Sequence, residues 1–275
     1  MADSNLPRSA GAATAPAAAG TARSSGAGVA HIMQSCSATH CLAVEAATRR
    51  VLSWATRRSG NRFGQLGRGK DAALSEAMVD LASAGAGDAT AARSPVVVVG
   101  VSAGGGKDAG HSAVVTAAGQ VLMFGCDRWQ QLGLGSPDAG AAGYTWEKGR
   151  IWQTTPRPAR LGAGDGTIRQ AACGADHTVA LARDGATVYT WGRGEHGQLG
   201  REARMFVGAP ARSSALSGGG GGGAGQTIAA VLAVGNCTAT CRADGTIIRS
   251  VGKCRAVHDE LLQAAAAATT PMNER

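Results

Sequence analysis

The sequence predicts an all-β protein made of repeated antiparallel hairpins, and three observations support this fold class. First, alternating apolar residues at 177–182, the turn Asp184-Gly185 and the β-branched and aromatic run 187–191 predict one hairpin. Second, weaker copies of this hairpin recur along the chain. Third, the chain of 275 residues contains 42 glycines but only 4% aromatic residues. That composition favours many short strands joined by tight turns.

The hairpin recurs at residues 36–67 and 110–133, and in a decayed form at 233–252. In the fourth copy Cys237 stands near the histidine position and the closing triplet is missing. A residue that recurs once per repeat is explained more simply by a structural role than by catalysis or metal binding. Each clear copy contains a histidine, an aromatic residue and a Gln-Leu-Gly triplet: His40, Trp54 and Gln65–Gly67; His111, Phe124 and Gln131–Gly133; His177, Trp191 and Gln198–Gly200.

The segments before and between the early copies have distinct compositions. Residues 1–30 are mainly Ala, Gly, Ser, Thr and Pro, so we expect them to be disordered. Their arginines and scarce acids leave an organelle transit peptide as the alternative. The alanine-rich stretch 72–81 predicts a short helix, and the run 95–99 predicts a strand buried on both faces.

The later connections contain fewer signals. Residues 70–94 and 136–155 are long connections that could supply missing strands, although we find no hairpin pattern in them. The segment 136–155 could also fold over a blade edge. The glycine run 218–223 predicts a flexible loop before an apolar strand at 228–234. At the end of the chain, residues 258–268 predict a marginal helix with an acidic residue near its start.

The third copy resembles the repeat of the regulator of chromosome condensation family. The resemblance implies a β-propeller of four-stranded blades, usually seven, and a platform for protein interactions. The founding type of that family exchanges guanine nucleotide on a small nuclear GTPase and docks on chromatin. Copy one departs from the pattern at Ser37 and Ala55, and copy two lacks the cysteine. The residues that match in family order are Cys173-Gly174, His177, Asp184-Gly185, Trp191-Gly192 and Gly197–Gly200.

The resemblance therefore implies a partial β-propeller over residues 31–254, with three to four repeats. The expected repeats are about 31–95, 96–155, 156–210 and 211–254, and a tail with the short helix follows at 255–275. Such a chain is too short to close a seven-bladed ring, which would leave open blade edges. A protein partner, a second copy, degenerate blades or a truncated chain would each account for this.

Two glycine motifs invite a nucleotide-binding interpretation that the pattern disfavours. The segment 192–197 matches GxGxxG, but a blade turn follows it where a helix would be needed. Val101 and Asp108 break the phosphate-loop pattern around Gly104–Lys107. No nucleophile, base and orienting acid can be assembled, so we predict neither an enzyme active site nor a cofactor or metal site. Exchange of nucleotide on a GTPase needs no such groups.

The cysteines and the hydropathy bound the compartment. Seven cysteines at these spacings form no recognisable disulfide framework, so we expect a reducing compartment and apolar roles for Cys36 and Cys173. No stretch approaches about 18 consecutive apolar residues, so we expect no membrane span. A cytoplasmic or nuclear location follows, with an organelle as the alternative.

The charge distribution supplies the one sharp functional hypothesis. The chain carries a formal net charge of +8, and much of it lies in an acid-free stretch at 46–70. A basic turn there would suit acidic protein surfaces, nucleic-acid phosphate or anionic lipid. We therefore predict a protein-interaction scaffold; the alternatives are guanine nucleotide exchange on a small GTPase and chromatin or nucleic-acid binding. The predicted partner-binding residues are Arg49, Arg50, Arg57, Arg58 and Arg62.

Overall fold

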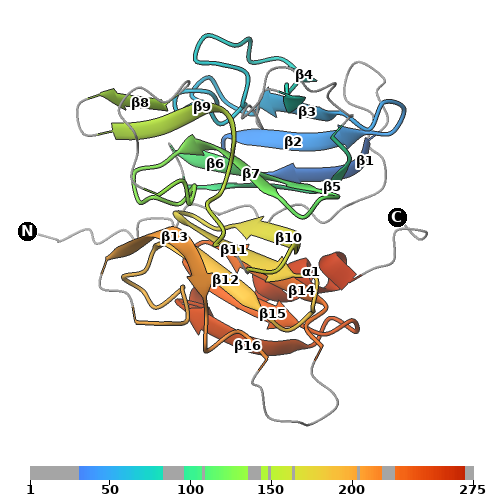
Figure 1. Cartoon of the computed structure of the whole chain (residues 1–275), viewed down its shortest axis with the longest axis vertical. Coiled ribbons are helices and arrows are strands. Elements are labelled where there is room, and N and C mark those ends of the chain that lie inside the picture. Colours follow the sequence, from blue (N-terminus) through green and yellow to red (C-terminus); the bar gives the residue numbers. More distant parts are fainter. Residues whose placement is uncertain are drawn as a thin grey trace, which may run out of the picture.

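The computed structural model describes residues 31–82, 96–106, 109–135, 144–147, 150–162, 165–202, 205–218 and 227–269. In this part of the chain, four antiparallel sheets lie in a ring like a four-bladed β-propeller (Figure 1). The predicted all-β class and propeller-type repeats are thus confirmed. The predictions for residues 1–30 and for most of the glycine run lie outside the described residues.

Each sheet is one blade, and the chain builds the blades in order. The second blade has five strands, and the fourth has three. The strands extend past the predicted repeat boundaries at 155 and 210. Blade 1 comprises β1 (His31–Cys36), β2 (His40–Glu45), β3 (Val51–Ala55) and β4 (Ala77–Met78); blade 2 comprises β5 (Val98–Gly105), β6 (Gly110–Thr116), β7 (Val121–Cys126), β9 (Arg150–Pro158) and β8 (Tyr144–Glu147); blade 3 comprises β10 (Ile168–Cys173), β11 (His177–Ala182), β12 (Val188–Arg193) and β13 (Phe206–Arg212); blade 4 comprises β14 (Ala230–Val234), β15 (Cys237–Cys241) and β16 (Ile247–Gly252).

The core lies between neighbouring blades. Because side chains of a strand alternate between its two faces, each central strand packs against the blade on either side. In β6, Ala113 and Val115 pack toward blade 3, and Val114 packs toward blade 1. All three side chains are buried. Burial on both faces explains the run of successive apolar residues in the middle of this strand.

A chain of two hydrogen bonds, called here the interblade latch, joins each blade to the next. The histidine Nε2 of one blade contacts the hydroxyl that follows the equivalent position in the next blade. That hydroxyl donates a hydrogen bond back to the first blade, to the backbone carbonyl of the glutamine in its Gln-Leu-Gly triplet. The three latches are His40–Ser112 (2.7 Å) with Gln65 (2.8 Å), His111–Thr178 (3.1 Å) with Gln131 (2.8 Å), and His177–Thr238 (2.7 Å) with Gln198 (2.7 Å).

The latches account for the recurring histidines. Each hydroxyl gives its one proton to a backbone carbonyl, so the histidine must donate from Nε2. Burial lowers the pKa of His40 to about 3, of His111 to about 4 and of His177 to about 3. The structural role predicted for these residues is therefore confirmed. The latch uses a hydroxyl of the next blade, which the repeat pattern did not indicate.

The recurring aromatic residues pack on the last glycine of the preceding triplet. The Phe124 ring lies against Gly67, and the Trp191 ring lies against Gly133. A Cβ on either glycine would stand 2.8 Å from the nearest ring atom, and both glycines have positive φ, at 68° and 67°. Glycine is therefore required at both positions on two separate grounds.

Helix α1 (His258–Thr269) covers the outward face of blade 4, in the segment where the sequence predicts a helix. Leu261, Ala264 and Ala265 pack against the apolar side chains of β14 and β15 on that face. Figure 1 shows α1 beside β14. The cap helix α1 thus occupies the place where a following blade would pack. The Cys237–Cys254 disulfide joins blade 4 to the segment just before the helix.

The expectation of unpaired cysteines is wrong for four of them. Cys36 and Cys41 are register partners across the β1–β2 turn, with Cα atoms 4.1 Å apart, and they form a second disulfide. Opposed positions of an antiparallel hairpin bring two side chains within bonding reach. The remaining cysteines, Cys126, Cys173 and Cys241, are free and buried.

One prediction about the connections is also wrong, and one possibility that the sequence left open is confirmed. Residues 72–81 form no helix, because Ala77–Met78 pairs with β3 as the fourth strand of blade 1. The Arg68 guanidinium also bonds the carbonyl groups of Ala73 and Ser75, which a helix would need for itself. Strand β8 pairs antiparallel with β9, so the connection 136–155 supplies a strand at the blade edge, although the sequence contains no hairpin signal there.

Candidate protein-binding face

The structure divides the predicted arginine cluster between two faces of the ring. Strand β3 pairs with β2 so that Ala55 lies opposite His40 and Val51 lies opposite Val44. Arg49 and Arg50 therefore lie at one end of β3 and residues 56–64 lie at the other, about 17 Å away for five residues of strand. We call the face that carries residues 56–64, 127–130 and 193–196 the loop face, and the opposite side the turn face.

Three of the five predicted arginines lie together on the loop face. Arg57, Arg58 and Arg62 are exposed, and none forms an ion pair with another described residue. Arg62 stacks over the Phe63 ring at 5.7 Å from its centroid. Arg49 and Arg50 are also exposed, but they lie on the turn face. The structure therefore leaves two smaller basic groups in place of one continuous basic turn.

Arg68, which belongs to the same stretch of sequence, has a structural role. Its Nε donates to the Ser53 hydroxyl and its Nη2 donates to the Ser53 carbonyl. Arg201 makes the equivalent bonds to Thr190 in blade 3. These internal bonds commit both guanidinium groups to holding the loop against its own blade.

The loops of the first three blades share one turn. The triplet glutamine accepts a hydrogen bond from the backbone N–H two residues earlier through its Oε1, at 2.8 Å in blades 1 and 2 and 2.9 Å in blade 3. Because the same bond recurs, each loop presents the residue two positions before the glutamine at the same place. These residues are Phe63, Trp129 and His196.

At the junction of blades 1 and 2 this place is closed. Phe63, Cys126 and Trp152 form a small buried cluster, in which the Phe63 and Trp152 rings meet edge to face at 5.9 Å. Strand β8 pairs with β9 beside them and places Thr145 opposite Trp152. The fifth strand therefore occupies the outer edge of the strand that carries Trp152.

At the junction of blades 2 and 3 the same place is open and charged. Arg193 stacks over the Trp129 ring at 4.5 Å, and Arg128 stacks at 5.4 Å. Arg193 also forms ion pairs with Asp176 at 3.3 Å and with Glu195 at 2.6 Å. Arg128 is exposed and forms no ion pair with a described residue. Aromatic residues and arginine are the residue types enriched at protein interfaces.

A buried carboxyl group supports the loop of blade 2. Asp127 accepts a hydrogen bond from the Leu132 backbone N–H at 2.9 Å, as Asn61 does from Leu66 in blade 1. Burial raises the pKa of Asp127 to about 7, although the Leu132 N–H and the Tyr144 hydroxyl both act to lower it. Sequence analysis missed this residue, and the only signal was its place four residues before the triplet glutamine.

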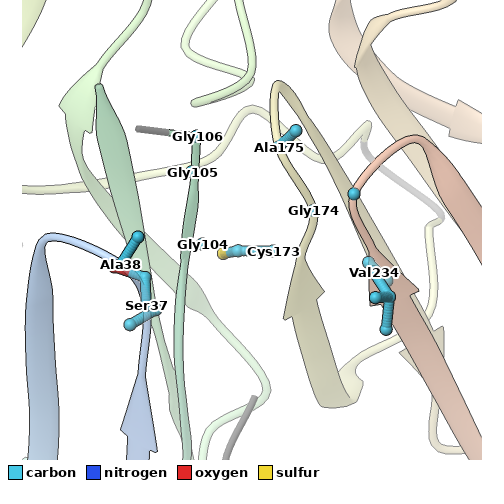
Figure 2. Close-up of a pocket in the computed structure, with 12 residues that line it drawn as sticks. Ser37, Ala38, Gly104, Gly105, Gly106, Cys173, Gly174, Ala175 and Val234 are labelled. Carbon is cyan, nitrogen blue, oxygen red and sulfur yellow. The ribbon is translucent and has the colours of Figure 1, made fainter. Parts of the chain in front are cut away.

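The inner turns of all four blades meet around a small cavity near the axis of the ring (Figure 2). Its volume is about 70 Å³, and its walls are glycine, alanine, serine, valine and cysteine residues. Figure 2 shows Cys173 directed at Gly104, and burial raises the pKa of this thiol to about 12. Pockets that hold small molecules measure about 300–1,000 Å³. The cavity is therefore suited to water and to packing rather than to a nucleotide.

Both glycine motifs belong to the blades, as the sequence favoured. Gly104 and Gly105 are the last residues of strand β5, and the Gly105 N–H donates to the Gly174 carbonyl of blade 3. Gly192 lies within β12, and Gly197 lies in the turn that follows it. In the described part of the chain no helix follows either motif, so neither forms a phosphate-binding loop.

The described residues contain no group of three or more His, Cys, Asp and Glu side chains that could hold a metal ion. None of the helices among them is long and apolar enough to cross a membrane. All five arginines that the sequence predicted as partner-binding residues are exposed. The structure adds Trp129, Arg128 and Arg193, which sequence analysis did not select.

Comparison with known proteins supports the repeat assignment. A family model described as regulator of chromosome condensation (RCC1) repeat matches residues 118–181 and 186–219, and a second model with that description matches 168–198. The chain is 30% identical over 200 residues to human RCC1 domain-containing protein 1, covering 64% of this chain and 48% of that protein. It is 35% identical over 142 residues to the mouse secretion-regulating guanine nucleotide exchange factor, covering 51% and 24%.

A solved structure shares the fold. The crystal structure of Prp20p from Saccharomyces cerevisiae superposes with a TM-score of 0.53 at 20% identity, over 72% of this chain and 40% of that one. The chain spans less than half the length of each of these three proteins.

Proposed function

Since the chain is a regulator of chromosome condensation repeat protein, we propose that it acts as a protein–protein interaction scaffold through its loop face. The observation that supports this proposal is a set of exposed arginines on this face that form no ion pair with another described residue, and two of them, Arg62 and Arg128, lie over aromatic rings of blades 1 and 2. The loops are held by repeated internal bonds, so these side chains are presented on a rigid frame. A rigid basic and aromatic surface suits an acidic protein partner.

A charge-reversal experiment tests this proposal. The triple variant Arg57→Glu, Arg58→Glu and Arg62→Glu reverses three charges on the loop face. The double variant Arg49→Glu and Arg50→Glu makes the same kind of change on the turn face and serves as the control. Partners recovered from cell extract with each tagged variant are quantified by mass spectrometry against the native protein.

We expect the triple variant to lose most of its specific partners, at least about tenfold in recovery, while the control retains them. Both variants should melt at the native temperature because their side chains are exposed. Equal recovery of the same partners with all three proteins would contradict the proposed role of the loop face.

The second candidate function is guanine nucleotide exchange on a small GTPase. The mouse relative is named as an exchange factor, which favours this candidate for the shared blades. An exchange factor acts by binding the nucleotide-free GTPase more tightly than the nucleotide-bound form, so it needs no catalytic side chain of its own. Release of fluorescent GDP from a panel of small GTPases tests it. No acceleration by the full chain at any concentration would exclude it.

Chromatin or nucleic-acid binding is the third candidate. Prp20p has been described together with its binding properties to Gsp1p and histones, and the loop-face arginines could contact phosphate. Binding of duplex DNA would weaken steeply with salt, and each lost phosphate contact would reduce the slope of log K against log salt by about 0.9. Replacing Arg57, Arg58 and Arg62 by alanine should therefore flatten the slope by roughly 3. An unchanged slope would remove this candidate.

The location of the protein is a separate proposal. It is the cytoplasm or the nucleus, with an organelle as the alternative.

A further inference from the structure

Strands β9 and β13 occupy equivalent places in blades 2 and 3. Gly125 pairs with Gln153 and Gly192 pairs with Val207, and the next pairs are Cys126 with Trp152 and Arg193 with Phe206. The loop that follows bonds the strand in the same way, because Asp127 N–H donates to the Ile151 carbonyl and Gly194 N–H donates to the Met205 carbonyl. Trp152 and Phe206 are therefore equivalent residues, as are Ile151 and Met205.

The two equivalent strands differ in what covers their outer edges. Strand β8 pairs with β9, and Trp152 is only 4% exposed. In the part of the chain that the structure describes, β13 pairs with β12 alone. Phe206 is 43% exposed and Met205 is 54% exposed. An exposed apolar strand edge is a template for pairing with another segment.

The backbone at this edge is arranged to accept a strand. The bond from Gly194 N–H to the Met205 carbonyl shows that the Met205 backbone groups point toward β12. Successive residues of a strand point their N–H and C=O groups to opposite sides, so those of Phe206 point away from β12. Trp152 has the same orientation in blade 2, where its partner is Thr145 of β8.

The side chains around the edge indicate the chemistry of the occupant. Trp129 lies on the loop beside the edge, at the position that Phe63 occupies next to Trp152. Arg193 is already paired with Asp176 and Glu195, whereas Arg128 is exposed and forms no ion pair with a described residue. An occupant with aromatic or other apolar side chains and one acidic residue would complement this surface.

We propose that the outer edge of blade 3, at Met205–Val207, binds an extended segment of a partner protein as a fifth strand, with an acidic residue of that segment facing Arg128. Strand β8 makes the equivalent addition to blade 2 within this chain. Main-chain pairing supplies affinity and the side-chain contacts supply specificity in this mode of recognition. The inference rests on the proposed scaffold function, and it assigns one site and one partner type to it.

A synthetic peptide with the sequence of the chain's own fifth strand, Gly-Tyr-Thr-Trp-Glu-Lys (residues 143–148), is the probe. Its binding to the full chain is measured by fluorescence anisotropy with a labelled peptide. Phe206→Pro removes the outward N–H and leaves the bonds to β12 intact, so affinity should fall about tenfold. The peptide with proline in place of threonine serves as the matched control ligand and should not bind.

Hydrogen exchange provides a test that needs no variant. The Phe206 amide of the native protein should exchange at least about tenfold more slowly when the peptide is saturating, because its N–H becomes bonded.

A charge-reversal variant tests the role of Arg128. Arg128→Glu should weaken binding of the native peptide but not of a peptide with Lys in place of its Glu. The Arg49→Glu, Arg50→Glu control should bind both peptides as the native protein does.

Three results would overturn the inference. They are absence of peptide binding, peptide binding that is unchanged in Phe206→Pro, and protection of the Phe206 amide without peptide in a dimer of this chain, which would make a second copy the occupant. None of them decides the scaffold proposal, which is tested separately through Arg57, Arg58 and Arg62. Retention of partners by that triple variant would overturn the role of those arginines and leave the peptide result unaffected.

Discussion

His111 connects a residue that is visible in the sequence to a measurable property of the fold. Its Nε2–H is bonded to Thr178, and its Nδ1 is buried without a hydrogen-bond partner. A second proton would place a charge on a fully buried ring, and this burial lowers the pKa of His111 to about 4, although the His177 backbone acts to raise it. The native state therefore holds the neutral ring, while the unfolded chain takes up a proton below its usual pKa of about 6.5.

This difference makes stability depend on pH with a definite sign. Between about pH 6.5 and 4 the unfolded state binds more protons, so stability is complete above pH 6.5 and declines as pH falls. Between pH 7.5 and pH 5 the free energy of unfolding should fall in both proteins, and the fall should be about 2 kcal/mol smaller in His111→Gln than in the native protein. Urea unfolding at the two pH values measures this. Thr178→Val, which removes the hydroxyl but no titrating group, should show the native pH dependence.

An identical decline in native protein and His111→Gln would contradict the buried neutral ring. Asp127 acts in the opposite direction, because burial raises its pKa to about 7 and its charge then destabilises the native state at higher pH. The comparison of two proteins that share Asp127 removes its contribution from the difference.

Gln130 adopts a backbone conformation that the other loops reserve for glycine. Its φ is 56°, and the equivalent residues are Gly64 and Gly197, at 73° and 77°. Left-handed backbone costs a residue with a Cβ about 1 kcal/mol or more relative to glycine. Gln130→Gly should therefore raise the free energy of unfolding by about 0.5–1 kcal/mol, after the greater chain entropy of glycine in the unfolded state is included.

Chemical denaturation of this variant beside Gly197→Gln gives a matched comparison, because the reverse change should lower the free energy of unfolding by about 1 kcal/mol. A loss of stability in Gln130→Gly would mean that the Gln130 side chain, which lies against Gly208, contributes more than the backbone strain removes.

Single residues were predictable where they recur and obscure where they differ. His40, His111 and His177 repeat at one position, so their structural role could be inferred from comparison of the copies. Arg49 and Arg57 lie close in sequence but at opposite ends of β3. Their spacing alone did not indicate that they would lie on opposite faces of the ring. Trp129 and Phe206 become neighbours in function only through the register of β12 and β13.

At the level of elements, the cap helix depends on its covalent attachment to blade 4. The Cys237–Cys254 disulfide closes a loop of 17 residues, and the Cys36–Cys41 disulfide closes one of 5. The loss of chain entropy in the unfolded state is greater for the longer loop. Cys254→Ser should therefore cost about 3 kcal/mol and Cys36→Ser about 2 kcal/mol, measured by denaturation of the oxidised proteins.

Addition of a reductant to the native protein should reproduce the sum of these losses and should have less effect on each single variant. If Cys36→Ser proved more damaging than Cys254→Ser, strain or packing rather than loop length would govern the contribution of these bonds. An equal stability of all oxidised and reduced forms would show that the bonds do not form in solution.

The elements themselves were predicted unevenly, for a physical reason. The inner strands of each blade have alternating or fully apolar patterns because they are buried between blades. Strands β4 and β8 lie at blade edges, where the hydrogen bonds to a neighbouring strand decide the conformation and the side chains carry little pattern. Residues 72–81 thus appeared helical by composition, and tertiary pairing outweighed that preference.

For the whole molecule, the cap helix replaces the packing that a further blade would give. Within α1, Leu261 faces blade 4 and is 1% exposed, whereas its neighbour Leu262 is 47% exposed. Leu261→Ala should lower the free energy of unfolding by about 2–4 kcal/mol, and Leu262→Ala should change it by less than about 0.5 kcal/mol. Light scattering should also detect self-association of Leu261→Ala only, because weaker packing of α1 exposes the apolar face of blade 4.

A monodisperse Leu261→Ala protein with native stability would show that α1 does not cover that face in solution. The need for a cover on a terminal blade follows from the number of repeats in the sequence. The sequence does not show which segment covers that blade, because the alanine-rich tail at 258–268 has no pattern that indicates where it packs.

The interblade latch also gives the ring a direction of assembly. Every junction joins a histidine of one blade to a hydroxyl of the next, so a head-to-tail contact between two copies would require a free hydroxyl at one end and a free histidine at the other. Blade 1 has Cys41 where the hydroxyl would stand, and blade 4 has Cys237 where the histidine would stand. Both sulfurs are already engaged in disulfides. Copies of this protein therefore lack the polar contact that would extend the ring into an open filament, the hazard of every heterologous interface that does not close.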